Sequence, residues 1–328
     1  MRLASSVLAL VIAGSASAVT MDWTPIGNPG NACDLQAGVG CFGAVPYSYS
    51  IGTYEVTNAQ YAEFLNSKAG TDPLGLYDPN MGNPVPGSSG YGGIARSGNA
   101  GSYTYTAIAG RENMPVNWVS FYDSVRFANW MNNGQGGGDT ETGAYTLLGG
   151  TPNPSNNWQI TRNQGAAIAI SSENEWFKAA YYDASTLSYF AYPAGSSVAT
   201  TCSGPSTSPN TANCGAGFTH QGDFTPVGAY VVSASPYGTF DQGGNAIEWN
   251  ETLLTQIPAG LSDRRLKGGS FQEISSLFNK TLCCSIGAYA EFGSYNRGFR
   301  LVLIPEPSTG LLVAAGLIGI ALRRRLPA

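Results

Sequence analysis

The sequence is poor in charged side chains and in histidine. Charged residues make up 11% of the 328 residues, whereas glycine alone contributes 43. Coiled coils and helical bundles need many charged helix formers and little glycine, so both classes are excluded. The 18 tyrosines, 13 phenylalanines and six tryptophans exclude a disordered chain. His220 is the only histidine, and we interpret it as a solvated loop residue.

Basic side chains are scarce away from the two ends of the chain. Four of the 16 lysines and arginines are Arg2 and the three residues 323–325. Residues 19–304 hold 12 basic and 20 acidic side chains, a net charge of −8. No basic patch remains for phosphate contacts, so nucleic acid is not an expected partner. An acidic exported domain instead suits solubility and divalent cations.

The first 18 residues have the pattern of a secretory signal. Arg2 gives a charged start, residues 8–13 are apolar, and Ala16-Ser17-Ala18 is a small-residue cleavage site. We therefore predict export and cleavage after Ala18. The alternative is a buried first strand or helix.

All six cysteines lie in the exported part of the chain. An even number in an oxidising compartment favours disulfides. Each of two cysteine pairs flanks one loop, so we predict two local disulfides, Cys33 with Cys41 and Cys202 with Cys214. The remaining two, Cys283 and Cys284, are neighbours, and a bond between them would strain the peptide. We interpret them as buried thiols and not as a redox pair.

Short elements and long loops predict one α+β domain without internal repeats. Capping-box patterns open helices at Thr57 and Ser172, and Ser120 caps a third that stops near residues 132–134. Alternating or apolar runs predict strands at 45–51, 103–106, 166–170, 227–232, 265–271 and 298–304. Residues 70–100 and 185–224 are rich in small and turn-forming residues and are expected to be loops.

The C-terminal end carries three features in a fixed order. Pro305-Glu306-Pro307 precedes an apolar run over 308–322, and three arginines follow. Fifteen residues are marginal against the roughly 20 that span a bilayer core as a helix. This order resembles the PEP-CTERM sorting signal of Gram-negative bacteria. The resemblance implies recognition by an exosortase, removal of the helix, and attachment to the cell surface or release. The alternative is an ordinary C-terminal membrane anchor.

Six motifs between residues 45 and 304 together resemble the sulfatase-modifying-factor, or formylglycine-generating-enzyme, domain. In chain order they are YEVTNAQY from 54, PVNWVS from 115, SENEW from 172, PYGTFDQGGNAIEW from 236, KGGSF from 267 and GFR from 298. The resemblance implies a variant of the C-type lectin fold with little regular secondary structure. It divides the chain into a signal at 1–18, a domain at 19–304 and a sorting signal at 305–328.

The resemblance also implies where a catalytic site would lie. The best-known members oxidise a peptide cysteine to formylglycine with two thiols that hold copper(I). Glu273 and Phe278 stand at the two thiol positions here, and neither is a soft ligand. Neither copper nor formylglycine generation is therefore expected, and Glu273 stays the only groove candidate. A second branch holds iron with histidines, which His220 alone cannot do.

The glycine-rich motif that ends at Trp249 implies a calcium site. In the family, calcium binds a side-chain oxygen, two carbonyls and a glutamate, and these map to Asp241, Gly244, Ala246 and Glu248. Calcium takes six to eight oxygen ligands in flexible geometry, which suits such a turn. The alternative is a plain turn with Glu248 solvated or in a salt bridge. Asn213 is a candidate for part of a second calcium site.

Three functions remain open at this point. The first is a binding module at the cell surface, for a polymer, a peptide or a partner. The second is an oxidoreductase with a non-standard site around Glu273. The third is a structural surface component. The missing catalytic groups favour an exported, calcium-stabilised binding or structural module, attached to the membrane only through its C-terminal helix before processing.

Overall fold

The computed structural model describes residues 18–87, 89–215, 222–254, 263–282 and 287–305. Several sequence predictions lie outside these residues: the signal up to residue 17, His220, Cys283, Cys284, and the sorting signal from Glu306 onward. No helix within the described ranges is long and apolar enough to cross a membrane.

Three α-helices begin where the capping patterns predict. They are α1 (Asn58–Lys68), α2 (Phe121–Asn132) and α3 (Glu173–Tyr181). Each is opened by a complete capping box, in which the cap side chain and the third helical residue satisfy each other's backbone amides. Short 3₁₀ turns at Pro79–Gly82, Asn157–Gln159 and Ser275–Phe278 add little further helix.

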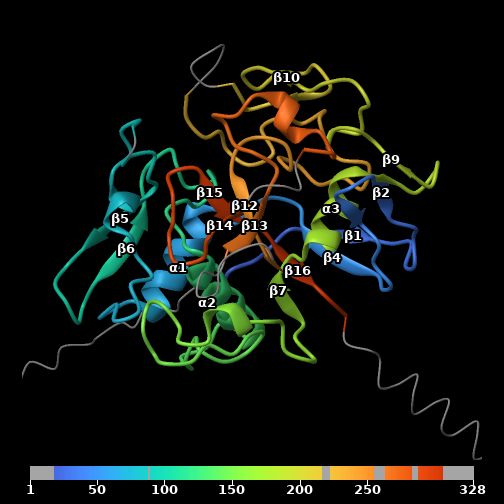
Figure 1. The fold of residues 1–328 in the computed structure, drawn as a ribbon. Coiled ribbons are helices and arrows are strands. Elements are labelled where there is room, and N and C mark those ends of the chain that lie inside the picture. Colours follow the sequence, from blue (N-terminus) through green and yellow to red (C-terminus); the bar gives the residue numbers. More distant parts are fainter. Residues whose placement is uncertain (1–17, 88, 216–221, 255–262, 283–286, 306–328) are drawn as a thin grey trace, which may run out of the picture.

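Two four-stranded sheets form the centre of the molecule (Figure 1). The first has the order β1 (Trp23–Ile26), β4 (Tyr49–Gly52), β16 (Leu301–Leu303) and β7 (Ile168–Ile170), all antiparallel. The second has the order β14 (Gly287–Tyr289), β13 (Asp263–Lys267), β12 (Ile247–Leu253) and β15 (Arg297–Phe299). In this sheet β12 and β15 are parallel. Each sheet joins segments from distant parts of the chain.

Two-stranded ribbons extend from this centre. They are β2 (Asp34–Gln36) with β3 (Gly40–Phe42), β5 (Ile94–Ser97) with β6 (Thr104–Ala107), β8 (Tyr182–Asp183) with β9 (Ser188–Tyr189), and β10 (Thr201–Cys202) with β11 (Thr211–Ala212). Disulfides Cys33–Cys41 and Cys202–Cys214 brace the first and last ribbons, with Cα atoms 5.5 and 4.8 Å apart. Both disulfide predictions are confirmed.

One predicted strand is wrong. Residues 227–232 form turns, in which Gly228 has φ +71° and Val231 is 63% exposed. Tyr230 is buried although Val231 and Val232 are exposed, and no strand of the described structure pairs with this segment, so its apolar residues do not form a strand. The predicted long loops also hold short elements, namely β5 in the first and β9, β10 and β11 in the second.

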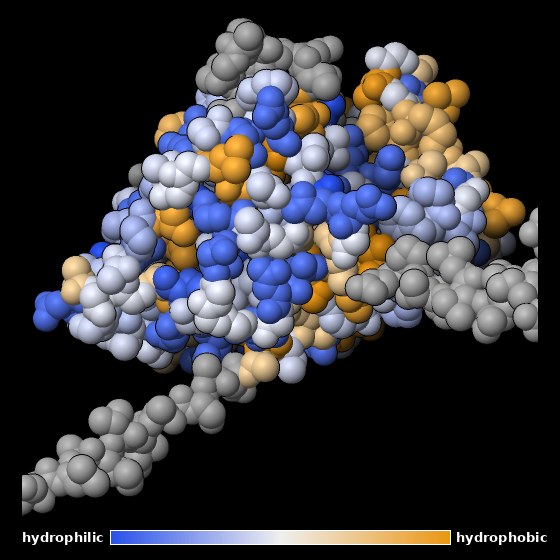
Figure 2. Space-filling view, turned by 90° about the horizontal axis from the view of Figure 1, so that it is seen from below, coloured by the Kyte–Doolittle hydropathy of each residue, from blue (hydrophilic) through white to orange (hydrophobic). Residues whose placement is uncertain are grey.

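The main core lies between α1, α2 and both four-stranded sheets. Tyr61, Phe64, Phe127 and Phe299 are fully buried and meet ring to ring, with centroids 5.3–6.4 Å apart. Outside this core the surface is mostly hydrophilic in the view from below, with apolar residues in small separate groups (Figure 2).

Candidate functional site

The glycine-rich turn before β12 is fixed in place by its own backbone. Asp241, Gly244 and Asn245 all have positive φ, between 57° and 94°. A Cβ atom on Gly244 would come 2.4 Å from the carbonyl oxygen of Asn213, so only glycine fits there. The amide of Gly244 donates to the carbonyl of Gly268 at 3.0 Å, and that of Asn245 donates to Asn213 at 2.9 Å.

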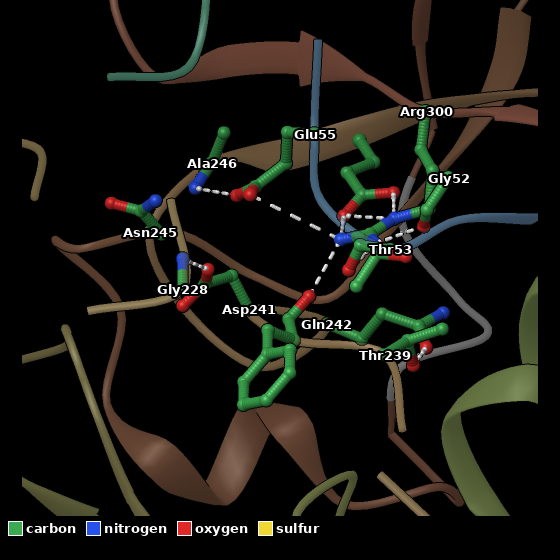
Figure 3. A network of polar contacts seen from close by, with 12 residues as sticks. Gly52, Thr53, Glu55, Gly228, Thr239, Asp241, Gln242, Asn245, Ala246 and Arg300 are labelled. Carbon is green, nitrogen blue, oxygen red and sulfur yellow. Dashed lines mark hydrogen bonds and ion pairs between the residues drawn. The ribbon is translucent and has the colours of Figure 1, made fainter. Parts of the chain in front are cut away.

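Arg300 is the centre of a buried polar network beside this turn (Figure 3). Its side chain is fully buried, and it pairs with Glu248 at 2.8 Å and 3.0 Å. Its remaining N–H groups donate to the carbonyls of Gly52, Thr53 and Phe240 at 2.7–2.9 Å. All five guanidinium donors are therefore used.

Glu248 reaches Arg300 because β12 and β15 are parallel neighbours. This pairing sets Glu248 opposite Gly298, two residues before Arg300. The Nε1 atom of Trp176, on α3, donates to the same carboxylate at 2.8 Å. Burial of Glu248 is thus compensated by one guanidinium and one indole.

Two further carboxylates lie near Arg300. One oxygen of Glu55 is 4.0 Å from the guanidinium and has no hydrogen-bond partner, and the other accepts the amide of Ala246 at 3.4 Å. Burial raises the pKa of Glu55 well above its usual value. Asp241 accepts the amide of Gly228 at 2.6 Å, and burial raises its pKa to about 6. If all three carboxylates were ionised, Arg300 would leave two negative charges unbalanced.

The predicted calcium ligands fit an ion only in part. Asp241 and Gly244 lie in the turn, Ala246 directly precedes β12, and Glu248 is the second residue of that strand. Their oxygens, with the carboxylates ionised, would suit a cation. Both oxygens of Glu248, however, already accept hydrogen bonds from Arg300 or Trp176. No group of three or more acidic, histidine or cysteine side chains converges on one point in the described ranges. Calcium therefore stays a prediction.

Asn213, the candidate for a second calcium site, holds the turn together. Its amide nitrogen donates to the carbonyl of Asp223 at 2.9 Å and to the side chain of Asn245 at 3.1 Å. Asp223 is in turn paired with Arg111 at 2.8 Å. These contacts give Asn213 a structural role in the turn.

The two positions that correspond to the family's thiols have different surroundings. Glu273 closes a tight turn, in which its carboxylate accepts the amide of Ser270 at 2.7 Å and contacts the hydroxyl of Ser270. Phe278 is fully buried, and a Cβ atom on Gly269 would come 2.5 Å from its ring. Both positions therefore have structural contacts. All four cysteines that the structure describes are in disulfides.

Sequence reasoning missed the residues at the centre of the network. Arg300 belongs to the motif GFR and Glu55 to the motif YEVTNAQY, but the sequence assigned neither residue a role. Backbone strain at two aromatic residues was missed as well: Tyr91 and Trp118 have φ of +63° and +60°. For Arg300, Glu55 and Trp118 the only available signal was their place in the motifs, because their contacts join segments far apart in the chain. Tyr91 lies in none of the motifs.

Comparison with models of protein families shows to which family this chain is related. The model described as "Sulfatase-modifying factor enzyme 1-like domain" matches residues 44–304, most of the chain. The chain belongs to this family. A second model, the PEP-CTERM protein-sorting motif, matches residues 303–325. The predicted resemblances to both are confirmed.

Two solved structures with TM-scores above 0.5 share the fold of this sulfatase-modifying-factor-type domain. "Crystal Structure of CarF" is 19% identical with a TM-score of 0.59, covering 88% of this chain and 99% of that one. "Treponema denticola variable protein 1" is 17% identical with a TM-score of 0.55, covering 89% and 98%. "Structure of PvdO from Pseudomonas aeruginosa" is 15% identical, with a TM-score of 0.45 and coverage of 87% and 92%. Comparison with curated proteins gives no match.

The comparisons support the single α+β domain and the sorting of the protein. The family match and the few short helices and strands agree with the predicted fold class. The PEP-CTERM motif implies export, processing by an exosortase-type system, and a cell-surface or extracellular location in a Gram-negative bacterium.

Proposed function

We propose that the protein is a surface-associated member of the family that lacks the copper and thiol oxidase chemistry and acts as a binding or structural module. The observation that carries this proposal is the environment of the two thiol positions. Glu273 is engaged by its own turn and Phe278 is a core residue. A copper(I) site needs thiolates that converge on the metal, and these two side chains supply none.

The proposal is tested with the mature protein, copper(I), oxygen and a cysteine-containing peptide. We expect no conversion of the thiol to an aldehyde, read by peptide mass and by a hydrazide probe. Copper content after desalting should equal that of a Glu273→Gln variant, because the carboxylate is not a copper ligand. Aldehyde formation above a control without protein would establish an oxidase instead. Loss of that activity in Glu273→Gln would then assign it to the non-standard site.

Calcium binding at the glycine-rich turn is a separate part of the proposal. The gathering of three carboxyl groups around Arg300 supports it, and the engagement of Glu248 weighs against that residue as a ligand. When bound, the ion would act as a fixed positive charge that ties the turn to β12, with Asp241 and nearby carbonyl oxygens as its ligands.

A further inference from the structure

An open pocket of about 440 Å³ lies beside β14, and no residue of the Arg300 network lines it. It is lined by β14, by the turn Phe292 to Ser294 and by Arg297. We call it the β14 pocket. Phe292 is 59% exposed and Tyr289 is 43% exposed, and their rings meet edge to face at 6.4 Å and 84°. Two large aromatic side chains thus share one open pocket, whereas single exposed apolar residues are ordinary.

The backbone that carries these rings is held firmly. The amide of Trp118 donates to the carbonyl of Ser294 at 3.0 Å, and a guanidinium nitrogen of Arg297 donates to that of Phe292 at 2.9 Å. A Cβ atom on Gly293 would come 2.5 Å from the backbone of Trp118, which has φ +60°. Exposed aromatic residues on a fixed backbone lose little entropy when they bind, so they suit a role as anchors.

The lining offers little charge to an ionic ligand, because its one charged side chain already makes other contacts. Arg297 is the only charged residue of the pocket, and its guanidinium already lies 5.4 Å from the ring of Trp249 and donates to Phe292. The other lining groups are the aromatic faces, small residues and the hydroxyl of Ser294. Aromatic faces contact C–H groups, and a hydroxyl with backbone groups suits hydroxyl partners.

An added peptide strand suits this edge poorly. The carbonyl of Tyr289 already accepts the amide of Phe292 at 3.3 Å, and that of Ala290 accepts the amide of Phe121 at 2.9 Å. Strand addition needs free backbone groups along the edge, and the carbonyls of the last residue of β14 and of the residue after it are taken. We propose that the β14 pocket binds a pyranose unit of a neutral polysaccharide. This inference names a ligand class for the binding module proposed above and rests on that function.

The experiment is affinity gel electrophoresis of the mature protein in native gels that contain dextran, starch, laminarin or mannan. We expect at least one polysaccharide to retard the wild type. Phe292→Ala and Tyr289→Ala should each weaken the binding by about fivefold to tenfold, the value of one aromatic contact. Val198→Ala is the matched control, because Val198 is 73% exposed and does not line the pocket.

Three results would overturn the proposal: no retardation by any of the four polysaccharides, equal loss with the Val198 control, or retardation unchanged in both aromatic variants. Capture of the protein on a peptide array that is lost in the Phe292 and Tyr289 variants, without polysaccharide binding, would show that the ligand of the pocket is a peptide and not a sugar. The aldehyde assay is read separately, so failure of sugar binding and failure of the non-oxidase function are distinguishable. Matching melting temperatures among the variants would show that folding is intact.

Discussion

Arg300 joins three parts of the chain that are far apart in the sequence: the end of β4, the stretch from Phe240 to Glu248, and its own position. It contacts the end of β4, the segment around Phe240, and Glu248 on β12, and its own place is between β15 and β16. A buried arginine with every donor used fixes these segments in one arrangement, since any displacement leaves a buried polar group unpaired. The network is a means of positioning the glycine-rich turn.

Arg300→Met should lower the free energy of unfolding by about 3–5 kcal/mol, because Glu248 would stay buried without a counter-charge. Arg300→Lys should lose less, since lysine keeps the charge but lacks the five-donor fork. Urea denaturation measures both. The double variant with Glu248→Gln should recover part of the loss, and Arg96→Lys at an exposed position is the control. A Met variant as stable as the wild type would show that the network contributes nothing.

Asp241 is the cleaner probe of calcium, because a substitution at Glu248 also breaks the pair with Arg300. If calcium binds only the folded protein, a hundredfold excess over Kd adds about 2.7 kcal/mol of stability. A chelator should therefore lower the melting temperature and millimolar calcium should restore it. Asp241→Asn should weaken this response in part, since an amide oxygen still coordinates. Magnesium should substitute poorly. A melting temperature indifferent to chelator and calcium, with no ion found by elemental analysis, would leave an ordinary turn.

The helices were the most predictable elements because their signals are local. A capping box lies within four residues, and all three of them open helices as expected. The strand at 227–232 failed because strand formation depends on a partner that the local pattern does not name. The site shows the same limit. Glu248 was singled out, but its partner Arg300 is 52 residues away and Glu55 is still more distant.

The capping box of α2 has a titrating member. Asp123 accepts the amide of Ser120 at 2.9 Å, and burial raises its pKa to about 7 against the ordinary 3.8. Arg126 lowers this pKa and Asp72 raises it, both to a smaller extent. When folding raises the pKa of a carboxyl group, the group contributes its full stability below the pKa of the unfolded state. This contribution is lost as the pH rises to the pKa of the folded state.

Relative to Asp123→Asn, the wild type should therefore lose stability between about pH 4 and pH 7, and the difference should be constant above that range. Each pKa unit corresponds to about 1.4 kcal/mol, so the change should be measurable by urea denaturation at several pH values. Asp139→Asn is the control of opposite sign, because hydrogen bonds from the backbone of Glu141 and from Thr142 lower the pKa of Asp139. A pH-independent difference would mean that Asp123 stays ionised in the folded protein.

At the scale of the whole molecule, both ends of the domain are built into one sheet, because β1 and β16 each pair with β4. Val19 is 8% exposed and belongs to the main core, whereas Ala18 is exposed. At the other end β16 pairs with β4 and β7, and the sorting motif begins directly after it. Processing at both ends can therefore leave the folded domain complete.

The last prediction concerns the mature N-terminus. The amide of Val19 donates to the side-chain oxygen of Gln135 at 2.6 Å, and the side-chain nitrogen of Gln135 donates back to the carbonyl of Val19 at 2.8 Å. Cleavage after Ala18 would turn that amide into an ammonium group, a stronger donor to the same oxygen. Gln135→Ala should then cost about 1–2 kcal/mol of stability.

A form that begins at Thr20 lacks the buried side chain of Val19, whereas Ala18 is exposed. Its free energy of unfolding should therefore be about 1.5–3 kcal/mol lower than that of a form that keeps Ala18. Intact-mass measurement of the protein from a host with an exosortase should find Val19 first and residues 308–328 absent. An end downstream of Val19 would contradict the cleavage site. Retention of residues 308–328 in such a host would leave a plain membrane anchor, since an exosortase substrate should lose the helix that follows its sorting motif.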